Sequence, residues 1–157
     1  MARGLRLPAG RAPSRDREPA ARVKLVRSPD LTDKAPYAYA AVAPPGARLI
    51  FTAGACPLDA AGETVAPGDI AAQAEQVMQN LRTALQAAGA DLGDVLKTTV
   101  YVAGGERKDL VTAWEVVRRH FGDHDAPSTL LGVSVLGYPD QLVEVEAVAA
   151  VREQRGE

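Results

Sequence analysis

The stretch Asp69–Val102, D-I-A-A-Q-A-E-Q-V-M-Q-N-L-R-T-A-L-Q-A-A-G-A-D-L-G-D-V-L-K-T-T-V-Y-V, joins a helix pattern directly to a strand pattern. Over residues 69–88, apolar side chains recur at spacings of three and four, which predicts an amphipathic helix. Asp69 places a carboxylate where the helix dipole favours one, and Gly89 is a typical C-terminal stop. The β-branched run Leu96–Val102 that follows predicts a strand.

Outward from this unit, the flanking segments predict five more strands and one more helix. The strands are expected at residues 23–26, 37–42, 48–52, 129–135 and 142–151, and the helix at residues 108–121. The apolar stripe of this helix consists of Leu110, Trp114, Val117 and Phe121. The order is therefore β-β-β-α-β-α-β-β. It predicts an α+β two-layer fold, in which a mixed six-stranded sheet carries two helices on one face. Residues 23–152 would form the domain, between a disordered tail at residues 1–22 and a short C-terminal tail at residues 153–157.

The last predicted strand has one apolar side and one mixed side. Side chains alternate between the two faces of a strand. Its apolar set is Val143, Val145, Ala147 and Ala149, and its mixed set is Leu142, Glu144, Glu146 and Val148. Two helices cover only one face of a sheet, so the mixed face is open, and a half-apolar open face invites burial against another subunit.

Composition narrows the class of protein. The chain has 157 residues and a formal net charge of −2, with aromatic residues at only 4%. A nucleic-acid-binding domain is usually basic and often carries stacking aromatics, so we expect no nucleic-acid partner. Apolar runs are too short to cross a membrane, and the single cysteine, Cys56, fits a reducing compartment such as the cytoplasm.

The basic residues gather in the N-terminal tail. Residues 1–22 contain six arginines and three prolines but few large apolar residues. Such a composition is typical of disorder, and it lacks the apolar centre of a secretory signal. We expect this tail to be dispensable for folding.

Several motifs together resemble the RidA/YjgF family, whose older name is endoribonuclease. The matching segments are Ala35–Tyr37, Leu49–Gly54, Pro57–Asp59, Gly62–Val65, Asp69–Ala74, Asn80–Leu81, Ala87–Gly89, Asp94–Val100 and Leu142–Ala149. The resemblance spans residues 23–151. It implies a chorismate-mutase-like fold and a homotrimer with a small-molecule cleft at each subunit boundary. Enzymes of this family hydrolyse reactive enamines and imines, such as 2-aminoacrylate.

The same resemblance indicates the site residues and two departures from the family pattern. Glu144 matches the carboxylate that positions or activates water, and Tyr37 matches a cleft tyrosine. The segment Asp125–Thr129 carries Pro127 where the family's enzymes have a carboxylate-binding arginine, and Ala53 replaces a serine. Proline offers no charge and no N–H, so it cannot take over that role. The expected ligand-binding set is Tyr37, Ala53, Gly54, Pro127, Ser128, Thr129 and Glu144.

Other interpretations of these residues remain open. Glu144 could form an interfacial ion pair with Lys97 or an arginine, and Tyr37 could be a half-buried aromatic with a satisfied hydroxyl. Arg48, Arg107 and Lys108 are candidate replacements for the arginine, but a solvated surface charge is the favoured interpretation of each. His120 and His124 are four residues apart, but Gly122 should end the helix between them, so we expect no metal site. We expect no cofactor, and Cys56 is interpreted as a small, partly buried residue.

Three functions follow as hypotheses. The first is a trimeric hydrolase of small imines or enamines that acts poorly on 2-aminoacrylate. The second is a non-enzymatic module that binds or senses a metabolite, and the third is a chaperone-like surface role. Fold alone cannot decide among them, because one fold hosts many functions.

Overall fold

The computed structural model describes residues 22–152. In chain order its elements are β1 (Lys24–Val26), β2 (Ala40–Val42), β3 (Ala47–Phe51), α1 (Ile70–Ala87), the short 3₁₀ helix η1 (Leu92–Asp94), β4 (Val95–Val102), α2 (Arg107–Phe121), β5 (Ser128–Gly132) and β6 (Val143–Arg152). The predicted α+β fold and the order of its main elements are confirmed. The tails expected at residues 1–22 and 153–157 lie, apart from Arg22, outside the described residues.

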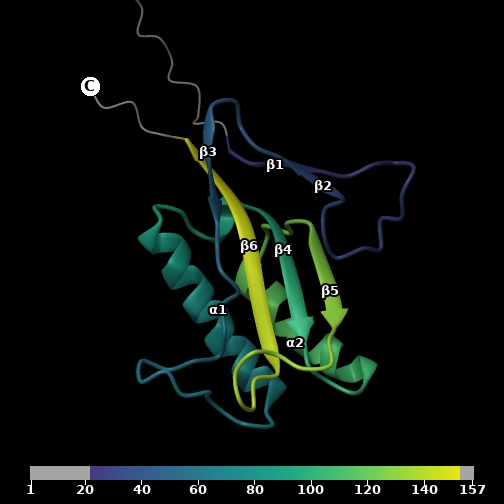
Figure 1. Ribbon diagram of the computed structural model, residues 1–157. Coiled ribbons are helices and arrows are strands. Elements are labelled where there is room, and N and C mark those ends of the chain that lie inside the picture. Colours follow the sequence, from purple (N-terminus) through teal and green to yellow (C-terminus); the bar gives the residue numbers. More distant parts are fainter. Residues whose placement is uncertain (1–21, 153–157) are drawn as a thin grey trace, which may run out of the picture.

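The six strands form two sheets rather than one. The main sheet has the order β3-β6-β4-β5, in which only β4 and β5 are parallel, and β1 pairs with β2 in a separate antiparallel ribbon. Figure 1 shows this ribbon beyond one end of the main sheet. The turn at Pro44-Pro45-Gly46 lies between β2 and β3. Proline cannot donate to a strand ladder, which explains why pairing stops there.

Both helices pack on one face of the main sheet, and the core lies between the two layers. The predicted apolar side of β6 points into it, and so does the side of β4 that carries Val100, since Val100, Val143 and Val145 are fully buried. From α1 the core receives Gln73, Ala74, Val77, Met78, Leu81 and Leu85. Gln73 is the polar member, and it is satisfied because its amide donates to the Asp140 carbonyl and accepts from the Leu142 N–H.

The second helix is rotated relative to the predicted stripe. Its buried residues are Ala113, Val116 and Val117. Leu110, Trp114 and Phe121, which the sequence pattern assigned to the core together with Val117, are only partly buried against it. A three-to-four spacing identifies a helix but does not fix how far its stripe turns towards the sheet. Trp114 therefore reaches the edge of the domain.

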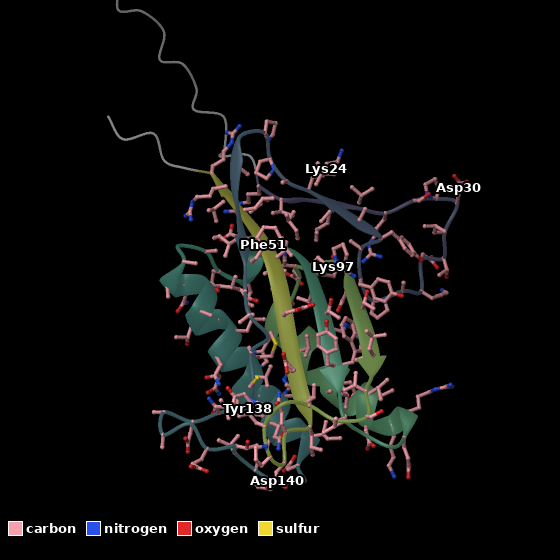
Figure 2. The ribbon with its side chains drawn as sticks, in the orientation of Figure 1. Lys24, Asp30, Phe51, Lys97, Tyr138 and Asp140 are labelled. Atoms are coloured by element: carbon pink, nitrogen blue, oxygen red, sulfur yellow. The ribbon has the colours of Figure 1, made fainter. Side chains whose placement is uncertain are left out.

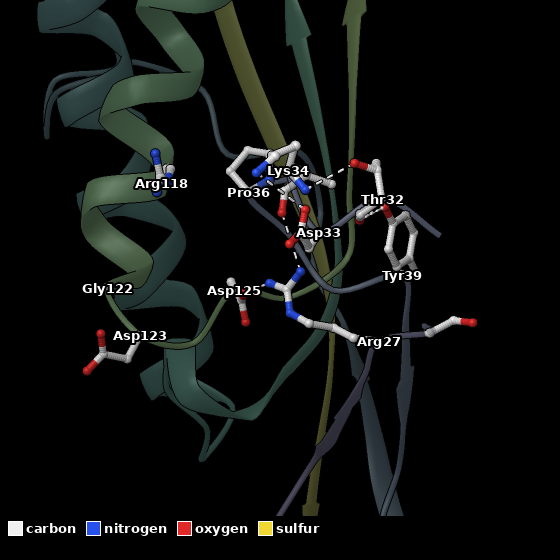
Figure 3. Close-up of a pocket in the computed structure, with 12 residues that line it drawn as sticks. Arg27, Thr32, Asp33, Lys34, Pro36, Tyr39, Arg118, Gly122, Asp123 and Asp125 are labelled. Atoms are coloured by element: carbon white, nitrogen blue, oxygen red, sulfur yellow. Dashed lines mark hydrogen bonds and ion pairs between the residues drawn. The ribbon is translucent and has the colours of Figure 1, made fainter. Parts of the chain in front are cut away.

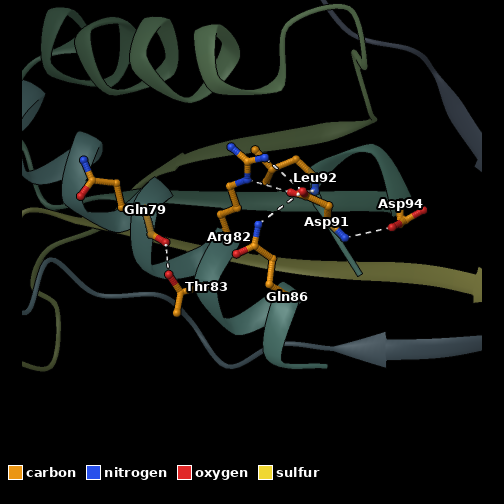
Figure 4. Close-up of polar contacts among 7 residues, drawn as sticks. All are labelled: Gln79, Arg82, Thr83, Gln86, Asp91, Leu92 and Asp94. Atoms are coloured by element: carbon orange, nitrogen blue, oxygen red, sulfur yellow. Dashed lines mark hydrogen bonds and ion pairs between the residues drawn. The ribbon is translucent and has the colours of Figure 1, made fainter. Parts of the chain in front are cut away.

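The connection from α1 to β4 is held by local polar contacts (Figure 4). Asp69 caps α1 by accepting a hydrogen bond from the Ala72 N–H at 2.9 Å. Beyond α1, Asp91 accepts from the Leu92 N–H at 2.8 Å and pairs with Arg82 at 3.0 Å. The contacts of Asp91 fix the turn that delivers β4 into the sheet. Within residues 22–152, no helix is long and apolar enough to cross a bilayer.

Candidate functional site

Glu144 lies on the open face of the sheet, near the start of β6. Its Oε2 atom accepts a hydrogen bond from Gln141 Nε2 at 3.1 Å. Gln141 is only 4% exposed, and it also donates to the Val143 carbonyl and accepts from the Tyr138 N–H. A fully bonded, buried amide holds its position, so it fixes the direction of the Glu144 carboxylate. Figure 2 labels Tyr138 and Asp140 in the loop that leads into this region.

The absence of a side chain at Gly54 makes room for Glu144. A Cβ atom built at Gly54 would lie 1.8 Å from Glu144 Oε1 and 2.6 Å from its Cδ. The two segments are joined by backbone hydrogen bonds between Ala55 and Val145, with the Ala55 N–H donating at 2.8 Å. The glycine is therefore required by the close approach of the carboxylate to the chain after β3. Ala53 is exposed and offers no polar group.

Cys56 borders the same carboxylate. Its thiol is partly buried and lies 3.5 Å from the Gly54 carbonyl. Burial raises the pKa of this thiol, and the negative charge of Glu144 raises it further. Cys56 is thus a neutral thiol at neutral pH, in keeping with its sequence interpretation as a small, partly buried residue.

Tyr37, Ser128 and Thr129 line a different hollow, at the free edge of β5. The hollow has a volume of about 450 Å³, and Trp114 and Leu130 complete its lining. Tyr37 comes from the loop before β2, because the strand predicted for residues 37–42 begins only at Ala40. The structure thus brings together three of the predicted ligand-binding residues and adds Trp114.

Two side chains bond to the hydroxyls of this hollow. Thr98, on the core side of β4, donates from Oγ1 to Ser128 Oγ, and the two oxygens are 2.7 Å apart. Lys97, on the open face, donates from Nζ to Thr129 Oγ1 over a distance of 2.5 Å. Pro127 is buried, and its carbonyl accepts from the Thr98 N–H. The β5 segment is thereby fixed against β4.

Within one chain, the Glu144 group and the β5 hollow are separate. Thr129 pairs with Thr99 on β4, and Thr99 pairs with Glu146 on β6, so two strand spacings divide the hollow from the Glu144 strand. Glu144 is a further two residues along β6, towards the loop containing Tyr138 and Asp140. Lys97 lies towards the other end of the sheet (Figure 2). Lys97 and Glu144 do not form an ion pair within the described chain.

Most of the other candidate residues bond to neighbouring groups of the chain. Arg48 donates to the Ala88 carbonyl at the end of α1, and Lys108 pairs with Glu106 at 2.8 Å. His120 bonds to Glu75, whereas His124 bonds to the Val95 carbonyl. Among residues 22–152, no group of three or more metal-ligating side chains converges. Arg107, the first residue of α2, is exposed.

A wider hollow of about 720 Å³ lies between residues 27–39 and the end of α2 (Figure 3). Its charges largely satisfy one another. Arg27 pairs with Asp125 and donates to the Ala35 and Tyr37 carbonyls, while Lys34 pairs with Asp33. Arg27 thereby anchors the loop that positions Tyr37.

Sequence reasoning missed two residues as site residues, namely Trp114 in the β5 hollow and Gln141 beside Glu144. Trp114 falls on an apolar helix stripe, and nothing in the periodicity separates a core tryptophan from one at the domain edge. Gln141 lies in a turn, so its contact with Glu144 depends on the backbone there, where Asp140 has φ of 58°. A glutamine three residues before a candidate catalytic carboxylate is a weak signal on its own.

Comparison with known proteins identifies relatives along most of the chain. The endoribonuclease L-PSP family matches residues 30–151. A RutC family protein of Pyrococcus horikoshii is 36% identical over 114 residues, covering 73% of this chain and 86% of the relative. The 2-iminobutanoate/2-iminopropanoate deaminase of Escherichia coli is 35% identical over 107 residues, covering 67% of this chain and 81% of the relative. A crystal structure of the Rid family protein YyfB of Yersinia pestis superposes with a TM-score of 0.75 at 27% identity, covering 83% of this chain and 100% of YyfB.

Proposed function

The chain belongs to the endoribonuclease L-PSP family, the RidA/YjgF family that its motifs resemble, and on that premise we propose that it hydrolyses small imine or enamine metabolites. We further propose that it acts as a homotrimer with a ligand cleft at each subunit boundary. 2-Aminoacrylate is expected to be a poor substrate. The similar deaminase of Escherichia coli supports the reaction class.

The observation that carries the proposal is the fixed carboxylate of Glu144. In imine hydrolysis, water adds to the carbon of the C=N bond, and the nitrogen gains a proton. The resulting carbinolamine then loses ammonia and leaves a carbonyl group. A carboxylate can take the proton from the attacking water and pass it to nitrogen. Gln141 and the space beside Gly54 hold Glu144 in one orientation for this role.

The separation of the two groups favours a site shared between subunits. Glu144 lies on the open face, while the hollow lined by Tyr37 and Ser128 lies at the edge of β5. If that edge meets the open face of a second copy, both groups can reach one ligand. The open face carries Phe51 and Leu49 at 72% and 48% exposure, and an apolar surface of this kind favours burial in an assembly.

The arginine-to-proline departure sets the limit on substrates. A guanidinium binds a carboxylate through two parallel hydrogen bonds, which Pro127 cannot make. Losing one partner of a buried charge pair costs about 2–5 kcal/mol. The reaction with 2-aminoacrylate should therefore be at least about tenfold slower than in arginine-bearing relatives, since 1.4 kcal/mol corresponds to a factor of ten.

The test is imine hydrolysis by the whole protein over a panel of imines generated by amino-acid and amine oxidases. Semicarbazide traps the imine that escapes hydrolysis, so an active protein lowers the trapped fraction. We expect activity on at least one imine, and Glu144→Gln should lower it by about a hundredfold, within the usual range for a general base. Glu146→Gln, on the same face of β6, is the matched control. If no imine is hydrolysed faster than in buffer, the proposal fails.

The second candidate, a non-enzymatic binding module, rests on one specific observation. Neither Pro127 nor Ala53 supplies the polar group that the family's enzymes use. Saturable ligand binding without turnover would support this alternative. In both cases we place the protein in the cytoplasm, because its single cysteine suits a reducing compartment.

A further inference from the structure

The hollow at the edge of β5 is uncharged. Its lining consists of Tyr37, Trp114, Ser128, Thr129 and Leu130. The rings of Tyr37 and Trp114 meet edge to face, with centroids 6.2 Å apart and an interplanar angle of 82°. This geometry is favourable for an aromatic pair and leaves ring surface available to a ligand. A volume of about 450 Å³ is in the range of small-molecule sites.

The polar side of the hollow offers hydrogen-bond donors to a neutral ligand. Ser128 Oγ accepts from Thr98, and Thr129 Oγ1 accepts from Lys97. With an acceptor role already filled, each hydroxyl keeps its own proton for donation. A neutral imine nitrogen or carbonyl oxygen accepts such a bond. A carboxylate among these residues would meet no charged lining residue, and the nearest ammonium, that of Lys97, is already bonded to Thr129, so the loss of hydration would be poorly offset.

From these contacts we infer that this hollow binds the bulky apolar end of an uncharged imine, so the substrates are imines of neutral ketones or aldehydes rather than 2-imino acids. The inference rests on the proposed imine hydrolysis. Tyr37, Trp114 and Leu130 contact the apolar group, and Ser128 or Thr129 donates to the polar atom. Trp114 is then a specificity-determining residue.

The position of Lys97 is the main argument for a competing substrate class. Its ammonium reaches Thr129 from the open face, where it also lines a smaller hollow of about 170 Å³ with Phe51, Thr99 and Glu146. A carboxylate-bearing ligand would have to draw this ammonium away from Thr129 and around the edge of β5. The experiment therefore compares ligands that differ only in the carboxylate.

Trp114 is the only tryptophan of the chain, so its fluorescence reports on the hollow directly. The matched probes are cyclohexyl methyl ketone and cyclohexylglyoxylate, which share the ring and carbonyl and differ in a methyl or carboxylate group. We expect a saturable emission change with the methyl ketone at a Kd at least tenfold below that of the glyoxylate. A linear, unsaturable loss of emission, as free N-acetyltryptophanamide would give, would overturn the inference.

Substitutions in and outside the hollow test where the methyl ketone binds. Tyr37→Ala should raise the Kd of the methyl ketone at least tenfold, and the milder Thr129→Val should raise it about threefold while preserving side-chain size. Tyr138→Ala, which removes an exposed tyrosine in the β5–β6 loop, is the matched control and should leave the Kd unchanged. Tighter binding of the glyoxylate, lost in Lys97→Met, would show that Lys97 holds a carboxylate and would overturn the inference.

A kinetic arm separates this inference from the proposed function. Amine oxidase converts 1-cyclohexylethylamine to the neutral imine, and amino-acid oxidase converts cyclohexylglycine to the matching 2-imino acid. Faster hydrolysis of the neutral imine supports both the inference on the hollow and the proposed imine hydrolysis. Equal or faster hydrolysis of the 2-imino acid overturns the inference but not the function. Binding of the methyl ketone without hydrolysis of either imine, or of any other imine in the panel, overturns the function and leaves the hollow as a ligand site.

Discussion

At the residue scale, a single hydrogen atom at Gly54 decides where the Glu144 carboxylate can lie. A methyl group there would overlap Oε1, with 1.8 Å between the two atoms. The overlap involves only the Glu144 side chain, from Cγ at 2.8 Å to Oε1, so this side chain has to turn away while the buried core is not contacted. Orientation and stability can therefore be separated by one substitution.

Gly54→Ala is expected to lower imine hydrolysis at least tenfold, equivalent to about 1.4 kcal/mol, because Glu144 is displaced from the position that Gln141 fixes. Its melting temperature should stay within a few degrees of the unmodified protein. Gly105→Ala is the control, since a Cβ atom at Gly105 meets nothing within 4 Å. Full activity in Gly54→Ala would show that the orientation of Glu144 is not used.

The thiol of Cys56 reports on the same carboxylate. Burial and the Glu144 charge raise its pKa, so at pH 8 less thiolate is present than on an exposed cysteine, and alkylation is slow. Glu144→Gln removes the charge and should lower that pKa. The rate of iodoacetamide alkylation should then rise at least twofold at pH 8, with its pH profile shifted to lower pH. Glu146→Gln should leave the profile in place; identical profiles for all three proteins would contradict the geometry.

At the element scale, the turn from α1 to β4 depends on Asp91. Arg82 donates to this carboxylate and lowers its pKa, and the Leu92 N–H lowers it further. A group with a depressed pKa stabilises the fold fully above its unfolded value, near 4, and loses that contribution as the pH falls through the folded value. The pair is largely exposed, so its share is small.

Asp91→Ala should therefore cost about 1 kcal/mol at pH 7, mostly through the lost cap, and lower the melting temperature by about 2–4 °C. The difference from the unmodified protein should shrink between pH 5 and pH 3. Asp33→Ala, which removes an exposed carboxylate beside Lys34, should change neither the free energy of unfolding nor the melting temperature. An Asp91→Ala effect that persists unchanged at pH 3 would mean that its charge contributes nothing.

Elements were predictable where local pattern decides them. The stripe of α1, its Asp69 cap and the alternation of β6 all reflect periodicity in the sequence, and the structure confirms them. The site was less predictable. The hollow at β5 depends on how far α2 is rotated, which places Trp114 at the edge. The sheet divides at Pro44 and Pro45, and a pattern of strand lengths does not specify which strands pair.

At the scale of the whole molecule, the two faces of the main sheet differ in what covers them. The helices bury one face, and the other presents Phe51, Val148 and Leu131 beside the polar pair of Tyr101 and Glu146, whose hydrogen bond is 2.7 Å long. An assembly through this face would bury apolar area and bring the Glu144 group towards the β5 edge of another copy. Assembly and activity are then linked in the proposed trimer.

Phe51→Glu is the sharpest test of that link. Phe51 is 72% exposed in the single chain, so glutamate there costs the fold little. In a trimer each copy would lose the burial of a phenylalanine, about 1.5–3 kcal/mol, and would bury a charge as well. Sedimentation equilibrium at micromolar concentration should give a trimer for the unmodified protein and a monomer for Phe51→Glu. Imine hydrolysis should fall with dissociation, because the monomer keeps Glu144 and the hollow apart.

Val111→Glu, at an exposed apolar position on α2, is the control and should remain trimeric. A monomeric unmodified protein contradicts the trimer, and a monomeric Phe51→Glu with full activity contradicts the shared site, since one chain would then suffice for the chemistry.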